Sequence, residues 1–334
     1  MNGSSRDVYA LLFPVVDSVD APQWLCDGIA SGVQAVILGE SRSEYVARTM
    51  SEERRSSETR TGLKNTIRSI RAAAGESDVL IAVDQEPWGI RRLHALVPAL
   101  DIAPGDDVAT FERKSFQMST EADRLGVGML LAPVLDRLSG HNPWLNGRTL
   151  TADYDRIGSL AAAFVSGARR AGIATAVKHF PGFPVVTADP ALDLAEVPKG
   201  EWTTDSLEPF RDCIAAGTAA VMVGPVPVLD IDATEPATTS RAVIALLRTE
   251  LGFDGVIIGD DLGAPGTRMG RSVPETALAA VRAGVDLLLV SGPEEMTQVA
   301  ERLEAEVAVD EAFAGTVSAS AARVRALATR RRPS

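Results

Sequence analysis

Short apolar runs alternate along the chain with longer segments in which apolar residues recur at helical spacing. The short runs are rich in β-branched residues and do not alternate between polar and apolar positions. This pattern is typical of strands in a parallel sheet that is buried on both faces. We expect such strands at residues 8–16, 34–38, 79–83, 127–132, 174–177, 219–223, 255–258 and 285–290.

The segments between these runs predict helices. Ser240, for example, is a favourable N-cap for a helix that Gly252 ends. Helices are expected at residues 22–32, 41–74, 93–100, 107–125, 153–171, 206–216, 241–251, 273–283, 293–306 and 311–330, with a charge-rich loop at 51–61 inside the second of them.

Eight predicted strands alternate with helices over 334 residues. This pattern favours an α/β fold of the (β/α)₈ TIM barrel type over an open, doubly wound sheet. The first predicted strand is not followed by the Gly-x-Gly-x-x-Gly pattern of a dinucleotide-binding fold. Since no linker rich in Pro, Gly or Ser interrupts the pattern, residues 1–334 are expected to form a single domain.

Composition narrows the classes of ligand. The net charge of −12 argues against nucleic acid and against anionic membrane surfaces, but it is compatible with neutral ligands such as sugars. No apolar run is long enough to span a membrane, and the N-terminus lacks the pattern of a signal peptide. Cys26 and Cys213 form neither a disulfide framework nor a metal cluster, so we expect a reducing, cytoplasmic location. The histidines show no ligand spacing, and no metal or cofactor is expected.

Polar residues follow several of the predicted strands at the point where each strand ends. They are Asp84 and Glu86 after the third strand, Asp136 after the fourth, Lys178 and His179 after the fifth, and Asp260 and Asp261 after the seventh. In a TIM barrel these ends meet at one mouth, where active sites are found. Carboxylates together with a Lys and a His suit the hydroxyl groups of a small sugar or glycoside. Glycoside cleavage also requires a carboxylate beside the anomeric carbon.

Four segments, in order and spacing, resemble the family-3 glycoside hydrolases, in particular the single-domain bacterial β-N-acetylglucosaminidases. The resemblance extends over about residues 8–327. The four segments are Asp84-Gln85-Glu86, Ala132-Pro133-Val134-Leu135-Asp136 with Gly147-Arg148, Lys178-His179-Phe180-Pro181-Gly182, and Gly259-Asp260-Asp261-Leu262. The third segment is the family's signature and the most specific of the four matches.

The resemblance implies roles for individual residues. Asp260 matches the nucleophile of the family. The groups that would bind the sugar's hydroxyls are Asp84, Arg148, Lys178 and His179, with Asp136 in a matching motif. Beside a Lys and an Arg, the carboxyl of Asp260 is expected to have a depressed pKa and to stay ionised.

The loop after the signature departs from the family. The family continues with Gly-His-Gly and then Asp-Ser-His, whose last His and Asp form the general acid/base pair. Here the same places are Gly182-Phe183-Pro184 and Asp189-Pro190-Ala191. Asp189 is retained and is expected to act in catalysis, while both histidines are missing. Candidates for the acid are Asp189, Asp193, Glu196 and His141. Phe183 and Trp88 indicate either an apolar wall for an aromatic aglycone or a collapsed loop.

Two classes of function follow. One is a retaining β-glycosidase, β-N-acetylhexosaminidase-like, acting as a monomer or homodimer with a non-standard or absent general acid. A glycoside phosphorylase is a variant of this class, since phosphate attacks without help from a base. The other is a non-catalytic, sugar-binding or regulatory descendant. Asp260 favours the enzyme, because a binding site gains little from a carboxylate under the anomeric carbon. The missing histidine favours the binding protein.

Overall fold

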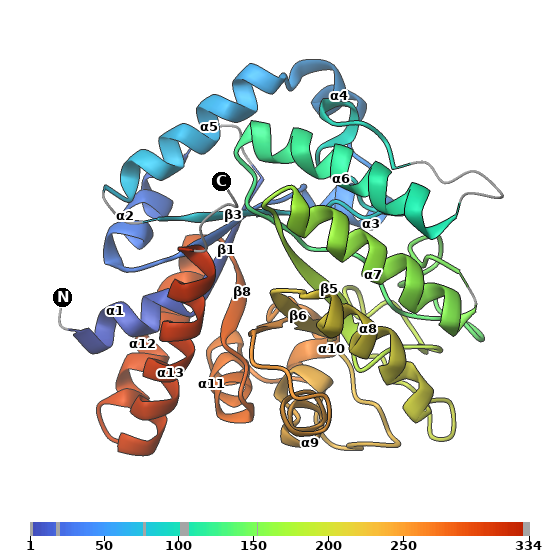
Figure 1. Ribbon diagram of the computed structural model, residues 1–334. Coiled ribbons are helices and arrows are strands. Elements are labelled where there is room, and N and C mark those ends of the chain that lie inside the picture. Colours follow the sequence, from blue (N-terminus) through green and yellow to red (C-terminus); the bar gives the residue numbers. More distant parts are fainter. Residues whose placement is uncertain (1–2, 18–20, 76–77, 101–106, 152, 330–334) are drawn as a thin grey trace.

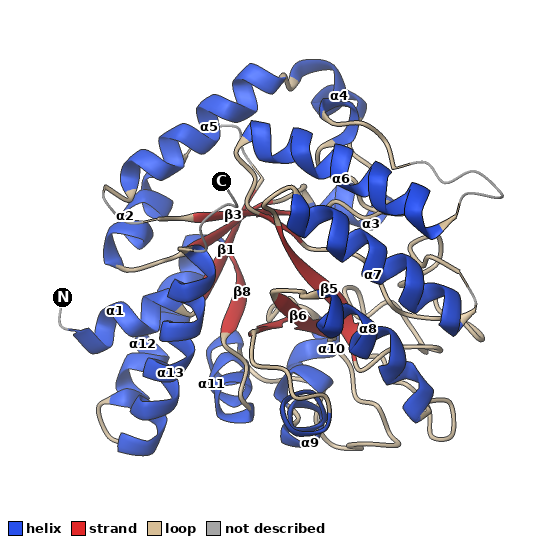
Figure 2. Cartoon of the chain, viewed as in Figure 1, coloured by secondary structure: helices blue, strands red, loops and turns tan. Residues whose placement is uncertain are grey.

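The computed structural model describes residues 3–17, 21–75, 78–100, 107–151 and 153–329. Its strands form one closed, parallel barrel in the order of the chain, with helices outside it (Figure 2), which confirms the predicted (β/α)₈ fold. The strands are β1 (Leu12–Val16), β2 (Ala35–Leu38), β3 (Leu80–Val83), β4 (Met129–Leu130), β5 (Ala174–Phe180), β6 (Ala220–Val223), β7 (Val256–Gly259) and β8 (Leu287–Ser291).

The barrel closes between its first and last strands. In the β1–β8 pair, Leu12 is in register with Leu288 and Pro14 with Val290. Because every strand pair is parallel, the carboxyl ends of all the strands lie at the same mouth of the barrel. Polar residues that are far apart in the sequence are thereby brought around one opening.

The helices surround the strands in chain order, from α1 beside the N-terminus to α13 (Figure 1). They are α1 (Gly3–Ala10), α2 (Gln23–Ser31), α3 (Arg42–Ala47), α4 (Glu52–Ser57), α5 (Arg60–Ala73), α6 (Val108–Leu125), α7 (Tyr154–Arg170), α8 (Glu208–Ala216), α9 (Arg241–Ala245), α10 (Pro265–Arg268), α11 (Val273–Ala283), α12 (Gly292–Val307) and α13 (Glu311–Ala328), with 3₁₀ turns η1 (His94–Leu96), η2 (Thr204–Leu207) and η3 (Ala237–Thr239) and a π turn η4 (Leu246–Glu250). The predicted helix at 273–283 has the bounds of α11, and most others agree within a few residues.

Two predictions near the N-terminus were wrong. The strand predicted at 8–16 begins only at Leu12, because the preceding residues form α1. Val8 and Ala10 are apolar because they lie on the buried face of that helix. The charge-rich segment 51–61 is not a loop throughout, since it contains α4, whose first turn is capped by the Ser51 hydroxyl.

The helix predicted at 93–100 is also wrong. Only the 3₁₀ turn η1 forms there. Val97 has an extended backbone, as expected for a residue that precedes a proline, here Pro98. The apolar residues of this segment, Leu93, Leu96 and Val97, are buried without lying in an α-helix. The last predicted helix, at 311–330, corresponds to α13, and residue 330 lies outside the described residues.

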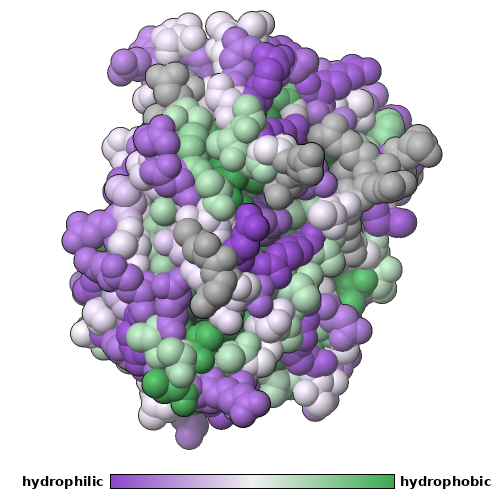
Figure 3. All heavy atoms as spheres, turned by 90° about the vertical axis from the view of Figure 1, so that its left-hand side faces the viewer, coloured by the Kyte–Doolittle hydropathy of each residue, from purple (hydrophilic) through white to green (hydrophobic). Residues whose placement is uncertain are grey.

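On the face drawn in Figure 3, hydrophilic side chains are spread widely and the strongly hydrophobic ones form small separate areas. None of the described helices is both long enough and apolar enough to cross a membrane.

Candidate active site

A cavity of about 510 Å³ opens at the carboxyl ends of the strands. This volume is within the range of sites for small molecules. Six of the residues singled out from the sequence line it together, namely Asp84, Arg148, Lys178, His179, Asp260 and Asp261. Apolar and aromatic side chains complete the wall, among them Trp24, Tyr45, Leu131, Trp144, Met222, Pro225 and Leu289.

Strand β5 supplies the signature pair. The strand was predicted to end at Val177, but it continues to Phe180 and so includes Lys178 and His179. Neighbouring residues on a regular strand point to opposite faces of the sheet. Here the register against β6 shifts between Lys178 and Phe180. Such an irregularity re-aims side chains, and both Lys178 and His179 line the cavity.

A buried ion network fixes the two cations of the site. The Lys178 ammonium donates to the Asp84 carboxylate and lies 2.9 Å from Oε1 of Glu86. Arg148 donates to the same Glu86 through Nη2 at 2.7 Å and Nε at 3.2 Å. Burial alone would raise the pKa of Glu86, but the charges of Arg148 and Lys178 lower it to about 2. Both cations are therefore already balanced by carboxylates and held in place.

His179 is oriented by Asp136. Nδ1 of His179 lies 2.8 Å from Oδ2 of Asp136, and the same oxygen accepts the His179 backbone N–H at 3.0 Å. Burial and the charges of Arg148 and Lys178 lower the pKa of His179, so the imidazole is neutral. Facing a carboxylate, Nδ1 is assigned the proton, and Nε2 is left as an acceptor.

Asp136 itself is completely buried and is not among the described residues that line the cavity. Its other oxygen accepts the Phe183 backbone N–H at 2.9 Å. Burial nevertheless raises the pKa of Asp136 to about 7. In the structure, the hydrogen bonds of Asp136 hold His179 and the start of the following loop. A contact between Asp136 and the sugar stays a prediction.

Asp260 follows β7 directly, and one of its carboxylate oxygens accepts no hydrogen bond from the described residues. Its Oδ1 accepts the Asp261 backbone N–H at 2.7 Å, while Oδ2 is buried without a hydrogen-bond partner among the described residues. Burial raises the pKa of Asp260 to about 6, with a further contribution from the Asp261 charge. The expectation of a depressed pKa was therefore wrong. Lys178 and Arg148 do act to lower it, but they do not outweigh burial.

The altered loop after β5 does not bring its acidic residue to the cavity. Asp189 accepts a 2.8 Å hydrogen bond from Nη2 of Arg48 and a 3.0 Å hydrogen bond from the Ala191 backbone. Pro190 and Ala191 line the cavity, but the described lining includes neither Asp189 nor the other candidate acids Asp193, Glu196 and His141. The catalytic role of Asp189 stays a prediction.

The two aromatic residues that suggested an apolar wall lie away from the cavity, Phe183 in the core and Trp88 at a half-buried position. Phe183 is fully buried and packs edge-on against Trp144, with ring centroids 5.6 Å apart. A Cβ atom at Gly224 would come within 2.2 Å of the Phe183 ring, so this glycine makes room for the phenylalanine. Trp88 stacks on Phe111 at 6.4 Å. Neither Phe183 nor Trp88 is among the described lining residues, so the loop is collapsed and the apolar-wall alternative was wrong.

Glu40, Tyr45 and Trp144 are among the lining residues that were not predicted from the sequence. Glu40 follows the strand predicted at 34–38, and the rule that found Asp84 and Asp260 applies equally to it. Tyr45 and Trp144 lie in segments between strands, where no local pattern distinguishes a lining residue from a core residue. They contact each other through a 3.3 Å hydrogen bond from Nε1 of Trp144 to the Tyr45 hydroxyl. The Trp144 ring lies 4.4 Å from the His179 ring.

The part of the chain that the structure describes contains no group of three or more His, Cys, Asp or Glu side chains placed to hold a metal ion. Among the acidic residues that line the cavity, Asp84 is paired with Lys178, whereas Glu40 and Asp260 each have one buried oxygen without a hydrogen-bond partner among the described residues.

Comparisons with known proteins point to one family. Residues 31–327 match the model of the glycosyl hydrolase family 3 N-terminal domain. A β-hexosaminidase of Stenotrophomonas maltophilia is 36% identical over 68% of this chain and 70% of its own, and one of Methylococcus capsulatus is 32% identical over 86% and 83%. The crystal structure of a β-N-acetylhexosaminidase from Beutenbergia cavernae superimposes with a TM-score of 0.85 at 28% identity, covering 98% of this chain and 99% of that one.

Proposed function

The chain belongs to glycosyl hydrolase family 3, and on that premise we propose that it is a retaining β-glycosidase of the β-N-acetylhexosaminidase class, with Asp260 as its nucleophile. The observation that carries the proposal is the buried Oδ2 atom of Asp260, which has no partner among the described residues and belongs to a side chain that lines the cavity. An unpaired buried carboxylate oxygen is costly for stability, and a site that uses it as a nucleophile accounts for its presence.

The reaction would proceed in two steps. In the first, an oxygen of Asp260 forms a bond to the anomeric carbon, the glycosidic bond breaks, and its electron pair leaves with the aglycone oxygen. In the second, water attacks the same carbon, loses a proton and releases the Asp260 carboxylate. Asp84, Lys178 and Arg148 bind hydroxyl groups of the sugar, and neutral His179 accepts a hydrogen bond through Nε2.

Protonation of the leaving group is the step for which this chain differs from the family pattern. Asp189 is paired with Arg48, and Ala191 stands where the family has its histidine. We infer that leaving groups which depart without a proton are the better substrates. General acid catalysis is worth about 10²–10⁴-fold, and that contribution is greatest for basic leaving groups.

The test is hydrolysis of a panel of 4-nitrophenyl β-glycosides by the wild type and by Asp260→Asn. We expect the wild type to release nitrophenol, with the N-acetyl-β-glucosaminide among the best substrates, and Asp260→Asn to lower kcat/KM by at least ~10³-fold. The control is Asp254→Asn, which changes an exposed aspartate just before β7 and should leave kcat/KM unchanged. Near-normal turnover by Asp260→Asn would exclude Asp260 as the nucleophile.

A second candidate function, sugar binding without catalysis, is favoured by the pairing of Asp189 with Arg48. It predicts no turnover of any activated glycoside, together with measurable binding of a sugar. The same panel, with calorimetric titration of N-acetylglucosamine, separates the two functions.

A further inference from the structure

Glu40 is an acidic residue of the cavity that has no role in the proposed reaction. It follows β2, separated from it only by Gly39, and lines the cavity with Asp84 and Asp260. Its Oε2 atom is buried and has no hydrogen-bond partner among the described residues. A buried carboxyl oxygen without a partner needs an explanation, and a ligand that supplies the partner is one.

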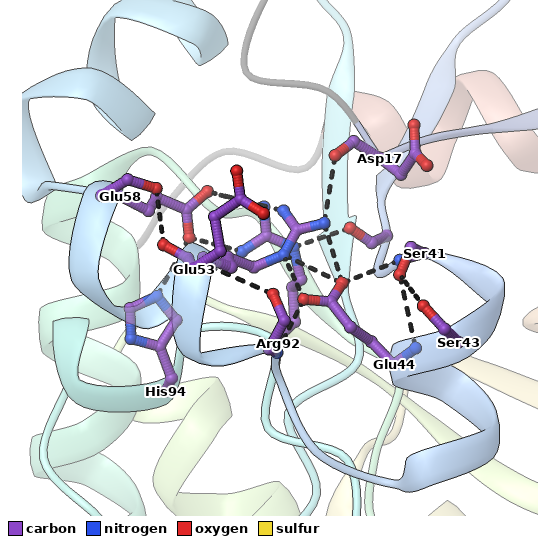
Figure 4. A network of polar contacts seen from close by, with 12 residues as sticks. Asp17, Ser41, Ser43, Glu44, Glu53, Glu58, Arg92 and His94 are labelled. Carbon is purple, nitrogen blue, oxygen red and sulfur yellow. Dashed lines mark hydrogen bonds and ion pairs between the residues drawn. The ribbon is translucent and has the colours of Figure 1, made fainter.

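Hydrogen bonds hold the backbone on both sides of Glu40, and Figure 4 shows Arg92, Glu58, Ser41 and Glu44, which take part in them. The Gly39 carbonyl accepts a 2.7 Å hydrogen bond from Nε of Arg92, whose guanidinium also pairs with both oxygens of Glu58 at 2.7 Å. On the other side, the Ser41 backbone N–H donates to Glu44 at 2.9 Å. The backbone that carries Glu40 is therefore fixed, which lowers the entropy cost of ordering this residue when a ligand binds.

Gly39 allows this segment to pass close to its neighbour. A Cβ atom at residue 39 would lie 2.6 Å from Cγ1 of Val15 in β1, far closer than two carbon atoms can approach. Glycine at this position lets the chain pass close to β1 at the point where it leads to Glu40.

Glu40 lies on the side of the mouth away from the nucleophile. Glu40 follows β2 and Asp84 follows the adjacent β3, whereas Asp260 follows β7, which β1 and β8 separate from β2. The charges that act most on Glu40 are Asp84, Lys178 and Arg92, and those that act most on Asp260 are Asp261, Lys178 and Arg148. The acid and the nucleophile of a retaining glycosidase are only about 5–5.5 Å apart. This placement favours a contact with the far end of the sugar over a role as general acid.

The two carboxyl groups at this end are chemically complementary. Burial and the charge of Asp84 raise the pKa of Glu40 to about 8, while Lys178 and Arg92 act in the opposite direction. Near neutral pH, Glu40 is therefore mostly protonated and can donate a hydrogen bond, whereas the Asp84 carboxylate, which is paired with Lys178, accepts one. A sugar hydroxyl both donates and accepts, so it can satisfy both groups at once. A carboxylate or phosphate at the same place would be repelled by Asp84.

We propose that Glu40 is a specificity-determining residue that, together with Asp84, binds a hydroxyl group at C4 or C6 of the sugar, on the side of the ring remote from the anomeric carbon that Asp260 attacks. The proposal rests on the proposed glycosidase function for its orientation of the sugar. It predicts that neutral hexosides are accepted, and that uronides and sugars phosphorylated at that end are rejected.

The test compares Glu40→Gln and Glu40→Ala with the wild type on a 4-nitrophenyl N-acetyl-β-hexosaminide and on its 4-deoxy and 6-deoxy analogues. We expect Glu40→Ala to lower kcat/KM about 10–100-fold on the parent substrate, and less than about 3-fold on the analogue that lacks the bound hydroxyl. Glu40→Gln, which keeps the shape and a hydrogen-bonding head, should lie between the wild type and Glu40→Ala. Exposed Glu201→Gln is the control. Equal losses on all three substrates would overturn the proposal.

Two further measurements distinguish this contact from proton transfer by Glu40 and from a failure of the glycosidase function. If Glu40 were the general acid, its variants would lose much more activity with poor leaving groups than with nitrophenol, and that result would also overturn the proposal. Binding of the uncleaved methyl thioglycosides, parent and deoxy, is measured by calorimetry. If the wild type cleaves no glycoside, the glycosidase function fails, but a loss of parent binding in Glu40→Ala that is absent for one deoxy ligand still supports the contact.

Discussion

The Asp189 carboxylate accepts a 2.8 Å hydrogen bond from Nη2 of Arg48, and this ion pair ties the loop after β5 to the end of α3. The same guanidinium donates to the Trp144 carbonyl at 3.2 Å and lies 4.5 Å from the centre of the Tyr45 ring. The group that faces Asp189 is thus an arginine, which does not release a proton near neutral pH. The pair can hold the loop in place, but Arg48 cannot replace the acid/base histidine of the family pattern.

The first prediction concerns this pair. Asp189→Asn keeps the shape of the side chain but weakens a partly buried ion pair, so the free energy of unfolding should fall by about 1–3 kcal/mol. If the pair only holds the loop, kcat/KM on nitrophenyl glycosides should change less than about 3-fold, since Asp189 is not among the described lining residues. Denaturant unfolding and steady-state kinetics measure the two effects. A loss of activity that grows as the leaving group becomes more basic would instead identify Asp189 as the acid.

The second prediction concerns leaving groups. With no acid at the family's position, the rate of glycosyl transfer to Asp260 should depend steeply on the basicity of the departing oxygen. A series of aryl glycosides with phenols of increasing pKa should show a steady decline in kcat/KM, and alkyl glycosides should be cleaved far more slowly. Similar rates on aryl and alkyl glycosides would mean that a residue of this chain protonates the leaving group.

The third prediction concerns pH. Asp260 must be ionised to act as a nucleophile, and burial raises its pKa to about 6. The protonated form gains population as the pH falls, so kcat/KM should decline below about pH 6, with a slope of about tenfold per pH unit. Asp261→Asn removes a charge that raises the pKa of Asp260, and it should move this limb to lower pH. A wild-type limb near the ordinary aspartate value of about 4 would contradict the structure.

The fourth prediction concerns Asp136, which we regard as a positioning residue. In Asp136→Asn an amide N–H₂ group must replace one carboxylate oxygen, although both oxygens accept N–H donors from His179 or Phe183. The free energy of unfolding should fall by about 1–3 kcal/mol. His179 should lose its fixed tautomer, which NMR of the imidazole nitrogens detects directly. An unchanged nitrogen spectrum would show that Asp136 does not set the tautomer.

Much of the site follows from the sequence because a parallel barrel converts a position in the chain into a position in space. Asp84, Lys178 and Asp260 each follow or end an apolar strand, and the topology places such residues at one mouth. The same rule covers Glu40, which was not among the predicted site residues. Predicting that a strand exists was enough to place these residues at the mouth, even where the predicted bounds differed from the observed ones, as for β1 and β5.

Other features depend on contacts that no local pattern encodes. The Arg48–Asp189 pair joins residues that are 141 positions apart. The pKa of Asp260 was mispredicted because the sequence shows two cations but not their partners. Lys178 and Arg148 are largely balanced by Asp84 and Glu86, so burial dominates. The burial of Phe183 likewise depends on the space that Gly224 leaves in a different loop.

The most direct test of the proposed function is covalent trapping of its nucleophile. The protein is incubated with an activated aryl 5-fluoro-glycoside of N-acetylglucosamine, whose fluorine slows breakdown of the glycosyl-enzyme, and is then analysed by intact-mass and peptide mass spectrometry. A retaining mechanism through Asp260 predicts one sugar per chain, attached to the peptide that contains Asp260 and absent in Asp260→Asn. A label on another carboxylate, or turnover of nitrophenyl glycosides with no label on Asp260, would contradict it.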